Sequence, residues 1–257
     1  MISYDSKAAR DTERSYLTPE IVRQRLKTLD AMVLRPGQRV LDAGCGTGLL
    51  AEQIAKSVGN SGHVACIDCS ADMLELARNR CRDLNQVELL QEYVEQLDFE
   101  ADSFDAVSCI QTLLYVKQVE TALKQMHRVL KPRGRIAILE TDWRGLVLAN
   151  QDESMTRKIA DAWDSAVESP NLPARLGALL RRAGFSAIKV EAIPIVNTSY
   201  SGNNFSSGML KWFAKNAVKH DAISAQESKQ WQAQIQELAD KDSYFFCVNR
   251  FLFSAVK

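Results

Sequence analysis

The spacing of hydrophobic residues alternates between two patterns along most of the chain. Continuous apolar runs of strand length, which are typical of buried parallel strands, occur near residues 40–42, 64–68, 87–91, 103–110 and 135–140. Between several of these runs apolar residues recur at helical spacing, as in 49–55 and 120–130. The alternation predicts an α/β domain whose parallel sheet carries helices on both faces.

The segments on either side of this region add further elements. Thr18-Pro19 predicts a helix start, and the amphipathic stretch up to Val33 is expected to pack on the sheet. Upstream, Arg14, Tyr16 and Leu17 either form a flap over a ligand or merely cover the sheet edge. We therefore expect one domain over 1–257, with a helical lid at 1–34, a ligand-binding half at 35–140 and a second-substrate half at 141–257.

The second-substrate half contains weaker signals. Its predicted elements are helices at 154–167 and 175–183, an alternating strand at 188–193 and an aromatic last strand at 244–256. A polar helical insertion at about 197–242 separates the last two strands and is predicted to cap the site. Its aromatic residues either line a pocket or form the cap's own small core; they are Tyr200, Phe205, Trp212 and Phe213, with Met209.

A glycine-rich turn follows the first predicted strand. The sequence from Asp42 to Gly48 has glycine at every second position from Gly44 onward, and a helical pattern begins at Leu49. Such a turn lets a ligand lie against bare backbone at a helix N-terminus. A dinucleotide fingerprint would require glycine where Leu49 stands, so a nicotinamide-dependent oxidoreductase is a poorer match. The tighter spacing favours a ligand with an amino-acid moiety, its cationic amine beside Asp42.

The second predicted strand also ends in an acid. Asp68 follows the last glycine by about twenty residues, the offset at which one carboxylate accepts hydrogen bonds from both hydroxyls of a ribose. Ser70 is a plausible N-cap for the helix that follows. A nucleoside with an amino-acid chain is therefore the expected ligand of the two strand ends.

On these residues the sequence resembles the class I S-adenosylmethionine (SAM)-dependent methyltransferases, of the small-molecule type that includes quinone and natural-product methyltransferases. Leu130 to Gly134 matches the Leu-x-Pro-x-Gly signature of that family before its fifth strand. The resemblance implies a Rossmann-like seven-stranded sheet in the order 3-2-1-4-5-7-6, with strand seven antiparallel. It also implies SAM as cofactor and S-adenosylhomocysteine (SAH) as product.

The resemblance carries over to individual positions. The family commonly has Gly-Asp-Ala after its third strand, whereas this chain has Glu92-Tyr93-Val94. We expect Tyr93 to meet the adenine base, Val94 to present its amide, and Glu92 to replace the missing carboxylate. The residues expected to contact the cofactor are Asp42, Ala43, Gly44, Cys45, Gly46, Gly48, Asp68, Cys69, Met73, Glu92, Tyr93, Val94 and Gln111.

Candidates for work on the methyl acceptor lie where the fourth and fifth predicted strands end. Gln111 and Tyr115 follow the run at 103–110, and Asp142 and Trp143 follow the run at 135–140. An aromatic ring of Trp143 or Tyr115 can face a sulfonium, and Asp142 can act as a base or orient the acceptor. The alternatives are a helix cap for Asp142 and packing within the cap for Trp143.

Composition and charge limit the kinds of partner that the chain is expected to bind. Lys plus Arg and Asp plus Glu both number 32, which argues against a nucleic-acid partner. No apolar run reaches the length of a membrane span, and the N-terminal residues lack an apolar signal core, so we expect a cytoplasmic protein without a membrane partner. The 6 cysteines fall on apolar runs and the 3 histidines are dispersed, so we expect packing roles and no metal site.

These features favour a SAM-dependent methyltransferase that transfers a methyl group to a small-molecule acceptor by in-line displacement. The alternative is a non-catalytic module of the same fold that binds SAM or SAH, which the unusual Glu92-Tyr93 favours slightly.

Overall fold

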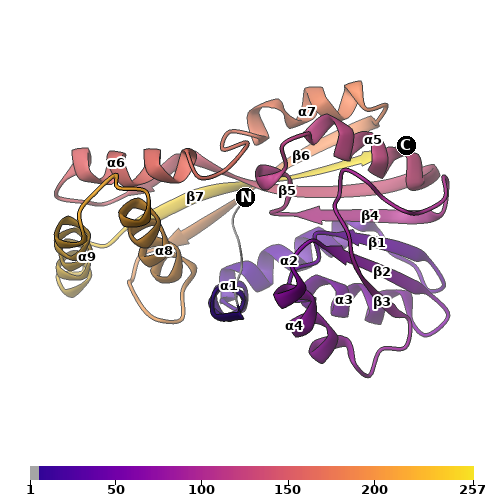
Figure 1. The fold of residues 1–257 in the computed structure, drawn as a ribbon, viewed down its shortest axis with the longest axis horizontal. Helices are drawn as coiled ribbons and strands as arrows, with labels where there is room; N and C mark the ends of the chain where they lie inside the picture. Colours follow the sequence, from indigo (N-terminus) through magenta and orange to yellow (C-terminus); the bar gives the residue numbers. More distant parts are fainter. Residues whose placement is uncertain (1–5) are drawn as a thin grey trace.

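The computed structural model describes residues 6–257, which form a seven-stranded sheet with helices on both faces (Figure 1). The strand order is β3-β2-β1-β4-β5-β7-β6, with β7 antiparallel to both of its neighbours, so the expected fold is confirmed. The strands are β1 (Arg39–Ala43), β2 (His63–Asp68), β3 (Val87–Gln91), β4 (Phe104–Ile110), β5 (Leu130–Leu148), β6 (Ser186–Asn197) and β7 (Phe246–Val256).

Helices pack on both faces of the sheet. The helices are α1 (Ser6–Tyr16), α2 (Pro19–Met32), α3 (Leu49–Val58), α4 (Ala71–Cys81), α5 (Val119–Val129), α6 (Glu153–Asp164), α7 (Pro173–Arg182), α8 (Phe205–Lys219) and α9 (Ala225–Asp240), with a 3₁₀ turn η1 (Leu113–Tyr115). Figure 1 shows α5 and α7 on one face of the sheet and α2, α3 and α4 on the other. None of the helices within 6–257 is both long and apolar enough to cross a membrane.

Both faces of the sheet are buried in separate apolar cores. On the face under α5 and α7, Leu123 and Leu176 pack with Val107 of β4. On the opposite face, Ile54 of α3 and Leu74 of α4 pack with Val64 of β2. Burial on both sides explains the continuous apolar runs in the central strands. It leaves the carboxyl ends of β1, β2 and β4 as the polar edge where a ligand can bind.

Strand β5 is much longer than the expected run at 135–140. Its pairing with antiparallel β7 continues through Asp142–Asn249 and, after an irregularity, to Leu148–Phe246. The expected turn at 131–134 lies inside β5 as a break in register between Leu130 and Arg135, where Arg133 has a φ of 67°. Because β7 pairs with the backbone beyond Glu140, the strand does not end where its apolar run ends.

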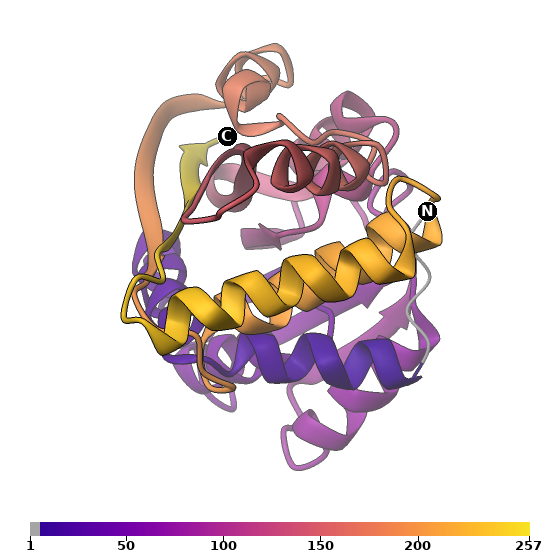
Figure 2. The same cartoon turned by 90° about the vertical axis from the view of Figure 1, so that its left-hand side faces the viewer.

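The long ends of β5, β6 and β7 support a helical cap. Figure 2 shows α9 running across this end of the molecule, with α6 and α1 on either side of it. Trp163 of α6 is 1% exposed and lies against Trp143 and Phe213 in the cap's own core. These aromatic contacts join α6 and α8 of the cap to β5.

Candidate functional site

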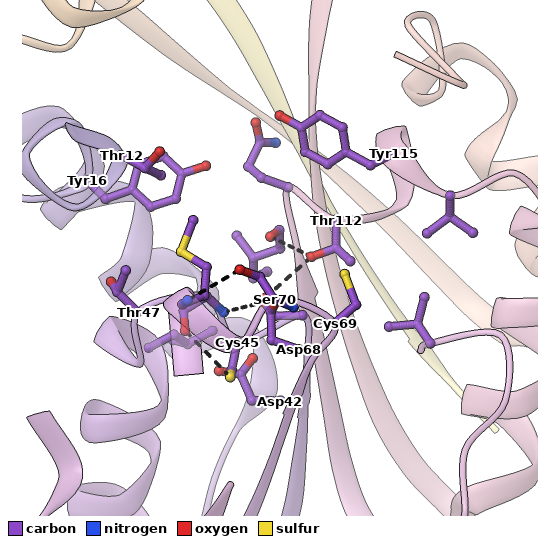
Figure 3. Close-up of a pocket in the computed structure, with 18 of the residues that line it drawn as sticks. Thr12, Tyr16, Asp42, Cys45, Thr47, Asp68, Cys69, Ser70, Thr112 and Tyr115 are labelled. Atoms are coloured by element: carbon purple, nitrogen blue, oxygen red, sulfur yellow. Dashed lines mark hydrogen bonds between the residues drawn. The ribbon is translucent and has the colours of Figure 1, made fainter. Parts of the chain in front are cut away.

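A cavity of about 350 Å³ opens at the carboxyl ends of β1, β2 and β4. One wall comes from α1 and α2, and the opposite wall comes from η1 and the segment after β3. Figure 3 shows Tyr16 and Tyr115 on opposite sides of this cavity, with Asp68 and Ser70 between and below them. The lining is mostly apolar with a few charged groups, which is typical of a small-molecule site.

The glycine loop forms the floor of the cavity. Gly44 has a φ of 78°, and a Cβ there would lie 2.2 Å from Thr112 Oγ1, so only glycine fits against η1. Gly46 has a φ of 54°, and nothing lies within 4 Å of where its Cβ would be. The open space at Gly46 faces the cavity, so a ligand can approach the backbone there. Gly48 and Ala43 do not line the cavity, and Gly48 instead packs on Ala77 of α4.

Asp68 ties the glycine loop to the start of α4. Its two carboxylate oxygens accept hydrogen bonds from the amides of Gly46 and Ser70, each at 2.9 Å. Ser70 Oγ in turn accepts from the Met73 amide and caps α4. Burial raises the pKa of Asp68, while the two amides oppose that shift. A carboxylate has about four acceptor positions, so two backbone donors leave capacity for ligand hydroxyls.

Asp42 contributes a second, deeper carboxyl group. It is 2% exposed, and its Oδ1 accepts a hydrogen bond from Ser108 Oγ at 2.7 Å. Its Oδ2 is buried and has no hydrogen-bond partner within 6–257. Burial raises its pKa to about 7, against the opposing effect of the Ser108 hydroxyl. An unpartnered buried carboxylate oxygen beside the cavity fits a cationic ligand group.

The residues expected at the adenine base are brought together on one side of the cavity. Cys69 and Met73 line it from the start of α4, and Glu92, Tyr93 and Val94 line it from the segment after β3. Val94 is buried, whereas the Tyr93 side chain is 56% exposed. The Glu92 carboxylate accepts a long hydrogen bond of 3.5 Å from the Asp98 amide. This side of the site is therefore open to solvent.

Gln111 and Tyr115 line the other side of the cavity. Gln111 has a φ of 53° and a nearly buried side chain. Its Nε2 donates to the Leu139 carbonyl at 3.2 Å, and its Oε1 accepts from Thr141 Oγ1 at 2.6 Å. Both ends of the side-chain amide are thus hydrogen-bonded to β5, so the side chain of Gln111 is held in place at the end of β4.

Asp142 and Trp143 lie outside the cavity. Because β5 continues beyond Glu140, both residues lie within the strand and not at its end, and Asp142 pairs with Asn249 of β7. Trp143 is 5% exposed and stacks on Phe205 in the cap core. The expectation that both residues flank the methyl group assumed that β5 ends near Glu140, and that assumption is wrong because β5 continues to Leu148.

Several lining residues were not expected from the sequence. They come from α1, α2 and β7 and comprise Thr12, Gln24, Arg25, Thr28 and Arg250, besides Tyr16 of the proposed flap. Gln24, Arg25 and Thr28 interrupt the apolar face of α2 although they are buried, and Arg250 stands within an apolar strand. A buried polar residue inside an apolar pattern was the signal available. Thr18 precedes α2 as expected but makes no side-chain cap.

Comparison with known proteins finds a family model that matches the central segment. Residues 40–134 match the model of a family described as a methyltransferase domain. An uncharacterized 37.1 kDa protein in transposon TN4556 of Streptomyces fradiae is 32% identical over 90% of this chain and 65% of its own length. The ubiquinone/menaquinone biosynthesis C-methyltransferase UbiE of Vibrio campbellii is 41% identical over 44% of this chain and 45% of its own length. The chain thus spans less than two thirds of these curated relatives.

Solved structures share the fold. Phosphoethanolamine N-methyltransferase 2 of Haemonchus contortus, in complex with S-adenosyl-L-methionine, has a TM-score of 0.65 at 21% identity, covering 99% of this chain and 57% of that one. The [4+2]-cyclase SpnF has a TM-score of 0.59 at 22% identity, covering 91% of this chain and 80% of that one.

Proposed function

We propose that this chain, whose residues 40–134 match a methyltransferase domain, is a class I SAM-dependent methyltransferase that transfers a methyl group from SAM to a small-molecule acceptor. The observation that carries the proposal is the open space at Gly46, next to a carboxylate that is tied to the same loop. An exposed loop backbone and an adjacent acid are the two features that a nucleoside with an amino-acid chain requires.

The unused hydrogen-bonding capacity of the site supports a position for the cofactor. Its ribose hydroxyls donate to Asp68, whose oxygens each retain acceptor capacity beyond one backbone amide. Its amine meets the unpartnered Oδ2 of Asp42. Met73, Tyr93 and Val94, which line the cavity, would hold its base. The exposed side of the cavity at Tyr93 then serves as the entrance for the nucleoside.

Once bound, the cofactor supplies a methyl group already activated by a sulfonium. The protein's task is to align the acceptor with that methyl, which is worth up to about 7–11 kcal/mol, and to exclude water. Gln111 fixes the wall at the end of β4, and the aromatic ring of Tyr115 faces the cavity across from Tyr16. Either ring can stabilise the sulfonium by cation–π attraction.

Binding and turnover test the proposal separately. Calorimetry with SAH should show a single site on the folded protein, and its failure would remove the proposal. Mass spectrometry of the protein with SAM and a panel of quinols, phenols and amines should then find a methylated product. SAH binding without any product would favour the non-catalytic module.

The titration of Asp42 predicts that SAH affinity depends on pH. Below its raised pKa of about 7, Asp42 is protonated in the free protein and cannot pair with the cofactor's amine. Binding must then release that proton, so the dissociation constant should rise by up to about tenfold for each pH unit below the pKa. Calorimetry across this range checks it, with Asp42→Asn as control: the variant should bind weakly and with little pH dependence. Equal wild-type affinities on both sides of the pKa would contradict the placement of the amine.

A further inference from the structure

The guanidinium of Arg250 is a buried cation that forms no ion pair with any residue in 6–257. Arg250 lies on β7, is 1% exposed and lines the cavity. Of its five N–H donors, only one at Nη1 donates to a described residue, to Gln24 Oε1. Its Nε is buried and has no partner within 6–257. Burial lowers its pKa from the usual arginine value, as expected for a desolvated cation.

The side chains around Arg250 hold its guanidinium in position, and none of those described forms an ion pair with it. The guanidinium carbon lies 4.7 Å from the ring centre of Phe205 and 5.9 Å from that of Tyr16. Glu140 is an acid that acts on it electrostatically, but no ion pair between the two is present among the salt bridges of residues 6–257. One Glu140 oxygen accepts hydrogen bonds from the amides of Thr112 and Leu113 instead, at 3.1 and 2.8 Å. Burial raises the pKa of Glu140 to about 8, and the positive charge of Arg250 is among the opposing effects.

A buried, unpaired charge lowers the stability of the fold. Apolar residues of similar volume often replace buried ions without loss of stability. An arginine at this position therefore needs a reason other than stability, and a ligand anion is the group that would satisfy its remaining donors.

Arg250 lies on the acceptor side of the cavity. In the sheet it pairs with Thr141 of β5, whose hydroxyl donates to Gln111. Its other neighbours are Tyr16 and Gln24 of the N-terminal helices. Asp42 and Asp68 instead lie at the ends of β1 and β2, on the other side of β4 and β5.

We propose that Arg250 binds a carboxylate of the methyl acceptor, with Gln24 orienting the guanidinium and the rings of Tyr16 and Phe205 supporting it. The proposal rests on the proposed function, because it assumes that the cofactor fills the Gly46 side of the same cavity. A carboxylate matches the planar fork of the guanidinium with two parallel hydrogen bonds. The acceptor is therefore a small carboxylic acid whose remaining surface meets the apolar lining.

Benzoate and benzamide provide a test that does not require the natural acceptor. They have nearly the same shape, and only benzoate is an anion. With SAH bound, the wild-type protein should bind benzoate about 10- to 100-fold more tightly than benzamide, measured by calorimetry or ligand-observed NMR. Arg250→Met should abolish this preference, leave the SAH affinity within about threefold, and keep or raise the urea midpoint. Arg250→Lys should retain part of the preference, and Arg182→Met, at an exposed arginine on α7, should retain all of it.

Three outcomes would overturn the proposal. The first is a wild-type protein that binds benzoate no better than benzamide, or binds neither. The second is a preference for benzoate that survives in Arg250→Met. If Arg250→Met does not fold, two other variants decide: the proposal is wrong if Gln24→Leu and Arg250→Lys both retain the full preference. The third is a loss of SAH affinity of more than about tenfold in Arg250→Met, because the guanidinium would then serve the cofactor's own carboxylate. If SAH does not bind at all, the proposed function fails, whereas the benzoate comparison without SAH still tests Arg250.

Discussion

Gly46→Val should abolish SAH binding while the domain stays folded. The position has a φ of 54°, and nothing lies within 4 Å of the place that a Cβ would occupy. The Cβ of valine therefore meets no protein atom there, and its methyl groups enter the space where the cofactor would contact the loop. We expect the affinity for SAH to fall by more than about a thousandfold, below detection by calorimetry.

The left-handed backbone at this position also lowers stability when a side chain is present, by roughly 1–2 kcal/mol. Gly37→Val is the matched control, because Gly37 also has a positive φ, of 82°, and its nearest atom is Ser61 Oγ at 3.7 Å. Gly37 lies in the turn before β1 and does not line the cavity. The two variants should unfold at similar urea concentrations, but only Gly37→Val should bind SAH. Wild-type affinity in Gly46→Val would mean that no ligand approaches this loop.

The cofactor side of the site was predictable because its parts are local. The glycine loop and Asp68 each directly follow a short apolar strand, and parallel neighbours place such strand ends together. The spacing of the glycines within one turn identifies a backbone-binding loop without any knowledge of distant contacts. The hydrogen bond between Asp68 and the Gly46 amide then joins two motifs that are 22 residues apart.

The acceptor side could not be predicted in the same way. The contact between Gln24 and Arg250 joins residues 226 positions apart, on α2 and β7. No local pattern links a helix near one end of the chain to a strand near the other. The placement of Trp143 at a strand end was wrong for a related reason, since the end of an apolar run does not mark the end of a strand whose partner lies about a hundred residues later. Arg250 itself was visible only as a charge inside an apolar strand.

Asp68→Ala should weaken SAH binding by about a hundredfold or more and should also destabilise the domain. Two hydrogen bonds from ribose hydroxyls to a carboxylate are together worth roughly 3–6 kcal/mol, and alanine removes both. The amides of Gly46 and Ser70 lose their acceptor as well. We therefore expect the free energy of unfolding to fall by about 1–3 kcal/mol, so a loss of affinity alone does not separate a ligand contact from a disturbed loop.

Asp105→Ala separates these two effects, because Asp105 performs the same structural task away from the cavity. It follows the first residue of β4, at the opposite edge of the sheet, where it accepts a hydrogen bond from the Arg39 amide at 2.8 Å and one from Lys131. Its removal should destabilise the domain to a similar extent and leave SAH affinity unchanged. If urea unfolding gives matched losses and calorimetry finds that both variants bind SAH equally well, Asp68 serves only the loop and the ribose lies elsewhere. If only Asp68→Ala loses binding, the carboxylate at the end of β2 has both roles, and the amides it accepts from hold it in position for the ligand.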